Sequence, residues 1–101
     1  MTIIYTIKES ICEIKLEDAL NHTEGEELIQ LCQELIDKET FSKIRFNMQN
    51  CESLSSSGIG SLVSISKMGL EKNINLELYQ CQDKVKKLLK ITGVDGVISV
   101  S

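Results

Sequence analysis

Aromatic residues are scarce in this chain of 101 residues, which has no tryptophan, two tyrosines and two phenylalanines. So few aromatic side chains give no evident platform on which nucleobases could stack. The formal net charge of −4 is a second argument against a nucleic-acid surface, because such surfaces are basic. We therefore expect no nucleic-acid partner and a core built from isoleucine, leucine and valine.

Histidine is nearly absent as well, since His22 is the only one, and no two cysteines form a Cys-x-x-Cys pair. The chain thus lacks the ligand spacing of a zinc site, and we expect no metal and no cofactor. Without a signal peptide, the four cysteines are expected to be reduced in a cytoplasmic protein. No apolar run approaches the roughly 20 residues that cross a bilayer, so we expect no direct membrane insertion.

Proline is missing altogether, and the chain has no linker, repeat or low-complexity tract. Its 42% apolar and 26% charged residues are ordinary values for one soluble domain. A domain of this size buries roughly two thirds of its unfolded surface, which is enough for one core without metal or disulfide staples. Residues 1–101 are therefore predicted to form a single domain.

The first half of the chain is predicted to contain three strands and one helix. Strands at about residues 2–7 and 11–16 are separated by a polar turn and suit an antiparallel hairpin. A helix capped by Asn21 or Thr23 follows and ends near Lys38. Its inward stripe is Leu28, Leu31, Cys32 and Leu35. Residues 43–48 alternate as a third strand, and the polar residues 49–57 are expected to form a loop.

The second half is predicted to contain two helices and two strands. One helix runs from the polar loop to about Leu70 or Glu71, and residues 74–79 form the fourth strand. Another helix is capped by Asp83 and closed by Gly93. Its inward face is Val85, Leu88, Leu89 and Thr92, and a short final strand contains Val97, Ile98 and Val100.

This order of elements predicts an α/β fold. The sheet is expected to be mostly parallel, with four or five strands and one antiparallel strand supplied by the N-terminal hairpin. Three or four helices accompany it.

The most informative stretch is Ser53-Leu54-Ser55-Ser56-Ser57-Gly58-Ile59-Gly60, which enters the second helix. Ser56 or Ser57 would cap this helix by accepting an amide hydrogen of its first turn. Free amides and the positive end of the helix dipole then favour an anion, including a phosphate on a serine. The stretch also lies at the carboxyl edge of the sheet, where open α/β folds meet ligands and partners. The alternative is that the serines form only a cap and a solvated loop.

Catalysis by these serines is not expected. A hydrolase elbow of the Gly-x-Ser-x-Gly type needs glycine where this chain has Leu54, and His22 is the only available base. Gly58 and Gly60 could begin a nucleotide-binding loop, but neither a third glycine nor a P-loop lysine follows. We therefore predict a protein that is not an enzyme, with nucleotide binding as the weaker alternative.

Three motifs resemble those of the STAS domain family, in particular of bacterial anti-sigma factor antagonists (anti-anti-sigma factors). Residues 16–21 look like the family's Leu-x-Gly-x-Leu-Asp turn, with Asp18 in place of the glycine and Asn21 in place of the aspartate. Residues 55–60 look like its Asp-Ser-Ser-Gly-Leu-Gly signature, with Ser55 in place of the aspartate. Residues 88–94 resemble its last helix, so the resemblance covers almost the whole chain.

The resemblance implies a partner switch. An anti-sigma factor that is also a serine kinase of the histidine-kinase-like ATPase type would phosphorylate Ser56, with Ser57 as the second choice. The unphosphorylated protein would bind that kinase and so release a sigma factor, and a PP2C-type phosphatase would restore the phosphorylated protein. Because Ser55 carries no charge, a second interpretation stays open. In that one the chain is an unswitched, constitutive STAS scaffold of a stress-signalling or lipid-transport complex.

Partner contacts are expected around Ser56. The expected partner-binding residues are Asn21, His22, Ser55, Ser56, Ser57, Gly58, Ile59, Gly60, Ser61 and Ser64, with the last two as exposed positions of the second helix.

Overall fold

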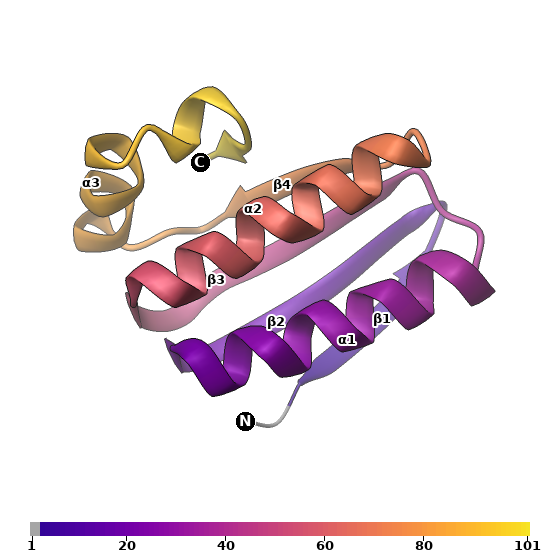
Figure 1. Ribbon diagram of the computed structural model, residues 1–101, viewed down its shortest axis with the longest axis horizontal. Coiled ribbons are helices and arrows are strands. Elements are labelled where there is room, and N and C mark those ends of the chain that lie inside the picture. The colour runs from indigo at the N-terminus through magenta and orange to yellow at the C-terminus, as the bar shows by residue number, and fades with distance from the viewer. Residues whose placement is uncertain (1–2) are drawn as a thin grey trace.

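Two long helices lie side by side across one face of a twisted sheet in the computed structural model, which describes residues 3–101 (Figure 1). The strands are β1 (Ile4–Lys8), β2 (Ile11–Leu20), β3 (Lys43–Leu54), β4 (Asn75–Tyr79) and β5 (Ser99–Val100). The helices are α1 (His22–Lys38), α2 (Ser56–Glu71), α3 (Asp83–Ile91) and the short 3₁₀ helix η1 (Val94–Gly96).

The five strands are arranged in the order in which they occur along the chain, from β1 to β5. β1 is antiparallel to β2, and every other neighbouring pair is parallel. This confirms the predicted α/β fold with its antiparallel N-terminal strand. Thr2, which the sequence places in the first strand, lies outside the described residues. Glu9 and Ser10 connect the hairpin with φ angles of 53° and 67°, the positive values that a type I′ turn requires.

The core lies between the sheet and the two long helices. Cys12, Ile14 and Leu16 alternate with more exposed residues along β2, as expected for a strand covered on one face. Helix α1 buries Leu28, Cys32 and Leu35 against them, while Leu31 is only half-buried. The apolar stripe predicted for α1 is therefore largely confirmed.

The third strand is longer than predicted, and the expected loop at residues 49–57 is wrong. β3 continues to Leu54 because residues 50–54 pair with residues 17–20 of β2, which is also longer than predicted. Two register shifts interrupt this ladder, so the buried Cys51 and Leu54 are three residues apart instead of two. A strand with such bulges lacks the period-two pattern from which strands are predicted.

The C-terminal elements also differ from the prediction. Helix α3 is capped by Gln82, and Asp83 is its first residue. Thr92 is exposed and not part of the inward face; its hydroxyl donates to the Leu88 carbonyl (3.0 Å). Gly93 follows with φ 79°, as expected of a glycine after a helix. Residues 94–96 then turn as η1, so Val97 is 60% exposed and the last strand is only Ser99–Val100.

The face of the sheet away from α1 and α2 is polar. Glu77 accepts from Lys43 Nζ (3.0 Å) and lies 3.5 Å from Arg45 Nε. The Arg45 guanidinium stacks over the Tyr79 ring, 3.9 Å from its centroid. No helix among residues 3–101 is long and apolar enough to cross a membrane.

All four cysteines are buried free thiols, so we expect them to be inert in the folded protein. Burial raises the pKa of Cys12 and Cys81 to about 11, and burial together with the nearby Cys12 raises the pKa of Cys32 to about 12. Since the thiolate is the nucleophile, Ellman's reagent should label the native protein at neutral pH far more slowly than the urea-unfolded protein. Rapid labelling of the native protein would contradict this.

The same shifts predict a loss of stability at high pH. A free thiol in the unfolded chain titrates near 9.0, whereas the folded thiols bind their protons more tightly. Their contribution is therefore complete below pH 9.0 and declines as the pH rises through 11. Thermal unfolding followed by circular dichroism across this range should show a falling Tm.

Candidate functional site

Helix α2 begins at the end of β3 and is capped by Ser55. The Gly58 amide donates to Ser55 Oγ (3.0 Å), and the Ser55 hydroxyl and amide both point to the Leu20 carbonyl, at 3.4 Å and 3.1 Å. The prediction of Ser56 or Ser57 as the cap is therefore wrong. Because β3 continues to Leu54, the helix starts earlier than the sequence suggested, and the capping position falls on Ser55.

Ser56 and Ser57 form the exposed start of α2. Both side chains are exposed, and neither hydroxyl has a hydrogen-bond partner within residues 3–101. Their backbone amides are likewise unpaired in that part of the chain, and the first turn of α2 contains no acidic residue. Unpaired amides at the positive end of a helix dipole favour a negative charge. An anion carried by either serine would therefore be well placed.

The start of α1 lies beside the start of α2. Leu20 and Leu54 are partners in the parallel ladder, so the two helices leave neighbouring strands at the same edge of the sheet (Figure 1). Asn21 caps α1, its amide donating to Glu24 Oε1 (3.1 Å), and His22 is the first residue of that helix. Both side chains are exposed. The structure thus brings Asn21 and His22 next to the serines, and their contact with a partner stays a prediction.

Glycines allow α2 to pack closely against Leu20 at the end of β2 and against α1. A Cβ atom on Gly58 would overlap the Leu20 carbonyl oxygen, and one on Gly25 of α1 would overlap Ser61 Oγ. A Cβ on Gly60, in contrast, would meet no atom within 4 Å. The first glycine of the Gly-Ile-Gly sequence is therefore required by packing, whereas Gly60 lies open on the surface.

Three of the expected contact residues are buried. Ser61 is 7% exposed, and its hydroxyl donates to the Ser57 carbonyl (3.0 Å), so the expectation of an exposed Ser61 is wrong. Gly58 and Ile59 are buried too and can only support the surface from beneath. Ser55 is half-buried. The residues that remain exposed are Asn21, His22, Ser56, Ser57, Gly60 and Ser64.

Sequence reasoning missed two features of this site. The first is the Leu20 carbonyl, which holds Ser55 in place and which no side-chain pattern could reveal. The second is Asp18, whose φ of 61° is left-handed. Aspartate is among the few residues other than glycine that adopt this conformation readily, so it can occupy the position where the resembling turn has glycine.

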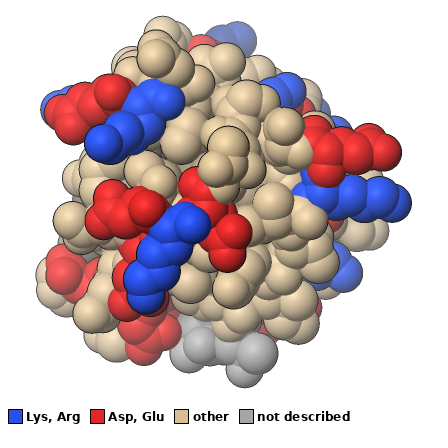
Figure 2. All heavy atoms as spheres, turned by 90° about the vertical axis from the view of Figure 1, so that its right-hand side faces the viewer, with Lys and Arg blue, Asp and Glu red and all other residues tan. Residues whose placement is uncertain are grey.

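No group of three or more histidine, cysteine, aspartate or glutamate residues within residues 3–101 could hold a metal ion. At the end of the molecule opposite the serines, basic and acidic side chains are interspersed (Figure 2).

A family model described as the STAS domain matches residues 2–101. No curated protein matches the chain. Among solved structures, the unphosphorylated form of the Bacillus anti-sigma factor antagonist SpoIIAA has a TM-score of 0.85 at 16% identity, covering 99% of this chain and 88% of its own. A candidate anti-sigma factor antagonist from Thermotoga maritima has a TM-score of 0.87 at 21% identity, covering 97% and 84%.

A sulfate transporter family protein from Wolinella succinogenes is also similar, with a TM-score of 0.77 at 12% identity over 94% of this chain and 79% of that protein. At such low sequence identities, these similarities show a shared fold and nothing more. The shared fold therefore occurs both in anti-sigma factor antagonists and in a sulfate transporter family protein.

The two glycines of the site provide a matched pair of variants. Gly58→Ala should destabilise the protein by about 1 to 3 kcal/mol because the new Cβ forces α2 away from Leu20. Gly60→Ala should stabilise it by about 0.5 to 1 kcal/mol, since alanine is the better helix former and the space is open. Urea unfolding followed by circular dichroism measures both. Equal effects of the two substitutions would contradict the close packing described for Gly58.

Proposed function

This chain belongs to the STAS domain family, and from that premise we propose that it is an anti-sigma factor antagonist switched off by phosphorylation of Ser56. In its unphosphorylated form it binds an anti-sigma factor that is also a serine kinase, and thereby releases a sigma factor. The observation that carries the proposal is the exposed Ser56 hydroxyl at the first residue of α2, which has no hydrogen-bond partner among the described residues. It is the position that follows the cap, at the carboxyl edge of the sheet.

The neighbouring serines are less suitable acceptors. The Ser55 hydroxyl already accepts from Gly58 and points to Leu20, so its phosphorylation would remove the helix cap. Ser57 is exposed and stays the second choice. A phosphate on Ser56 would instead add about −1.5 to −2 charge beside the free amides of α2. The fold should survive this change, whereas the surface that the partner contacts should no longer bind it.

The uncharged Ser55 is compatible with this function. Serine and aspartate are both good helix caps, so the structural task of the family's aspartate is fulfilled by the Ser55 hydroxyl. The loss of its charge affects only electrostatics. With no acidic residue in the first turn of α2, an incoming phosphate meets less repulsion from this helix.

The partner surface consists of the exposed residues of the site. Asn21 and His22 on α1 flank Ser56, and Gly60 and Ser64 continue the surface along α2. A kinase of the histidine-kinase-like ATPase type would bind here, and a PP2C-type phosphatase would reach the phosphate at the same open edge. We propose a cytoplasmic location for this cycle and no catalytic activity of the chain itself.

A constitutive scaffold is the second candidate. Two observations favour it, namely the missing charge at Ser55 and the similarity of the fold to a sulfate transporter family protein. As a scaffold in a stress-signalling or lipid-transport complex, the chain would hold its partner through the same surface and would not be phosphorylated.

Intact-mass spectrometry distinguishes the two candidates. After incubation with ATP and the serine kinase encoded nearest to it, the protein should gain one phosphate, which peptide mapping should assign to Ser56. Ser56→Ala should remain unmodified and bind the kinase permanently. Ser56→Asp should bind it more weakly by about 1 to 3 kcal/mol, the range in which charge changes at interfaces act.

The binding comparison is made by isothermal titration calorimetry, with circular dichroism to verify that both variants fold. Equal affinity of Ser56→Ala and Ser56→Asp would argue against an electrostatic switch. An unmodified wild-type protein that still binds its partner would favour the scaffold.

Ser55→Asp tests the role of the missing charge. Aspartate should retain the cap, so the free energy of unfolding should change little. If the acidic group helps the kinase to recognise the acceptor, the rate of Ser56 phosphorylation should rise several-fold, as measured by a time course of intact mass. An unchanged rate would show that the charge at this position is irrelevant to the kinase.

A further inference from the structure

Strand β1 leaves one of its edges open. It is the terminal strand of the sheet, and no other strand pairs with its outer edge within residues 3–101. Lys8 and Ile11 close the two-residue turn and are therefore a hydrogen-bonded pair. Such pairs alternate along an antiparallel ladder. The backbone groups of Ile4, Thr6 and Lys8 consequently face β2, whereas those of Ile3, Tyr5 and Ile7 point outward.

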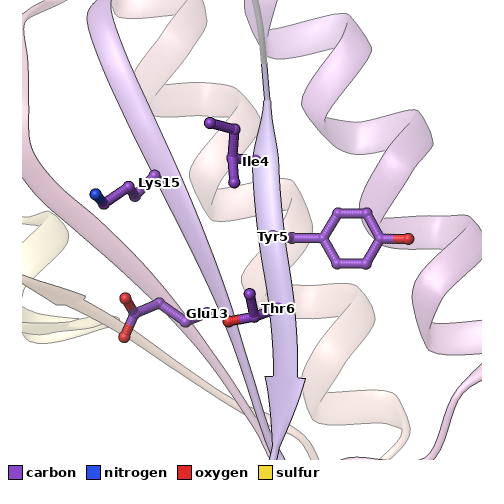
Figure 3. Close-up of a pocket in the computed structure, with 5 residues that line it drawn as sticks. All are labelled: Ile4, Tyr5, Thr6, Glu13 and Lys15. Atoms are coloured by element: carbon purple, nitrogen blue, oxygen red, sulfur yellow. The ribbon is translucent and has the colours of Figure 1, made fainter.

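The residues whose backbone groups point outward also carry largely apolar side chains. Tyr5 is 44% exposed and Ile7 is 36% exposed. Tyr5 projects to one side of the strand, away from Ile4 and Thr6, which share the opposite face with Glu13 and Lys15 of β2 (Figure 3). Ile3 and Ile7 lie on the same side as Tyr5 because side chains alternate along a strand. The open edge thus combines two exposed apolar side chains, Tyr5 and Ile7, with backbone groups that pair with no other strand of residues 3–101. Ile3 on the same side is half-buried and packs partly against the core.

This edge has little of the usual protection against pairing, because its one charged residue, Lys8, lies at the turn end of β1. Natural edge strands are commonly blunted by proline, by a bulge or by a charged side chain in the strand. Residues 3–7 contain no proline and no charged residue, and the register of β1 with β2 is unbroken. The strand is therefore suited to bind another strand of matching pattern.

We propose that β1 pairs with the β1 strand of a second copy of this chain, antiparallel about a two-fold axis at Tyr5. In this register Tyr5 lies opposite Tyr5 of the second copy, and Ile3 opposite Ile7. Each of these pairs exchanges two backbone hydrogen bonds and places apolar side chains against each other. On the other face Ile4 lies opposite Thr6, so no like charges oppose one another within residues 3–7. The sequence of the edge is self-complementary, which favours a second copy over an unrelated strand.

The resulting dimer is weak and leaves the serines free. A contact of about five residues per chain lies far below the area of stable interfaces, so association should depend on concentration. Strand β2 separates β1 from β3, and α2 with Ser56 starts beyond the end of β3. Both copies could therefore carry an accessible Ser56, and the proposal does not depend on the switch.

Sedimentation velocity from micromolar to millimolar protein tests the proposal. The wild-type protein should shift from the monomer toward twice its mass as the concentration rises. Tyr5→Pro should remain monomeric because it removes an outward amide while leaving the bonds between β1 and β2 intact. Leu70→Glu, at a 58% exposed apolar residue at the end of α2, is the control and should dimerise like the wild type.

The register is tested by a charge pair. Ile7→Glu should weaken the dimer, whereas the double variant Ile3→Lys/Ile7→Glu should restore it, since each lysine then faces a glutamate of the second copy. Within one chain these residues are four apart, about 13 Å along the strand, so they cannot pair internally. Circular dichroism identifies any variant that fails to fold.

Two outcomes would overturn self-pairing. One is a wild-type protein that stays monomeric up to millimolar concentration, which includes the case that only a strand of another protein occupies the edge. The other is a dimer that folded Tyr5→Pro and Ile7→Glu variants leave unchanged, because such a dimer would use a different surface. Failure of either kind would leave Ser56 phosphorylation, measured separately by mass, unaffected.

Discussion

The contact between the Leu20 carbonyl and the start of α2 is the constraint on which the site depends. This oxygen accepts hydrogen bonds from the amide and the hydroxyl of Ser55. The helix can come close enough for these contacts because Gly58 has no side chain. Because Ser55 is fixed from both sides, its hydroxyl is occupied. Ser56, one residue further, is left exposed, and its amide has no partner in the part of the chain that the structure describes. The chemistry of the site follows from this division between a structural serine and a free one.

Much of the fold could be predicted because apolar side chains recur at a regular spacing along its helices and strands. The apolar stripe of α1 and the alternation of residues 43–48 in β3 identify these elements, and the polar turn at Glu9 and Ser10 identifies the hairpin. Prediction was wrong where the backbone departs from regular period. The bulges in the ladder between β2 and β3 interrupt the alternation, so the last residues of β3 were not predicted as strand. The 3₁₀ helix η1 occupies residues expected to lead directly into the final strand.

The sequence was enough to locate the candidate site, but not to determine which serine is the cap or which residues are exposed. Three consecutive serines before a helix indicate a capped N-terminus, yet which serine is the cap depends on where β3 ends, and that depends on the bulges. The burial of Ser61 depends on Gly25 of a different helix, a contact between residues 36 positions apart that no local pattern contains. The residues expected to contact a partner thus differ from those that are exposed because tertiary contacts bury some of them.

The substitutions that distinguish this chain from the resembling motifs are conservative in the physical sense. Asp18 adopts the left-handed conformation for which the motif has glycine, and Ser55 supplies the cap for which the motif has aspartate. In both cases the conformation is kept and only the chemistry of the side chain changes: a charge is gained on the turn and lost at the cap. Since the backbone geometry around Ser56 does not require the aspartate, its role in relatives that have it would be electrostatic, directed at the partner and not at the fold.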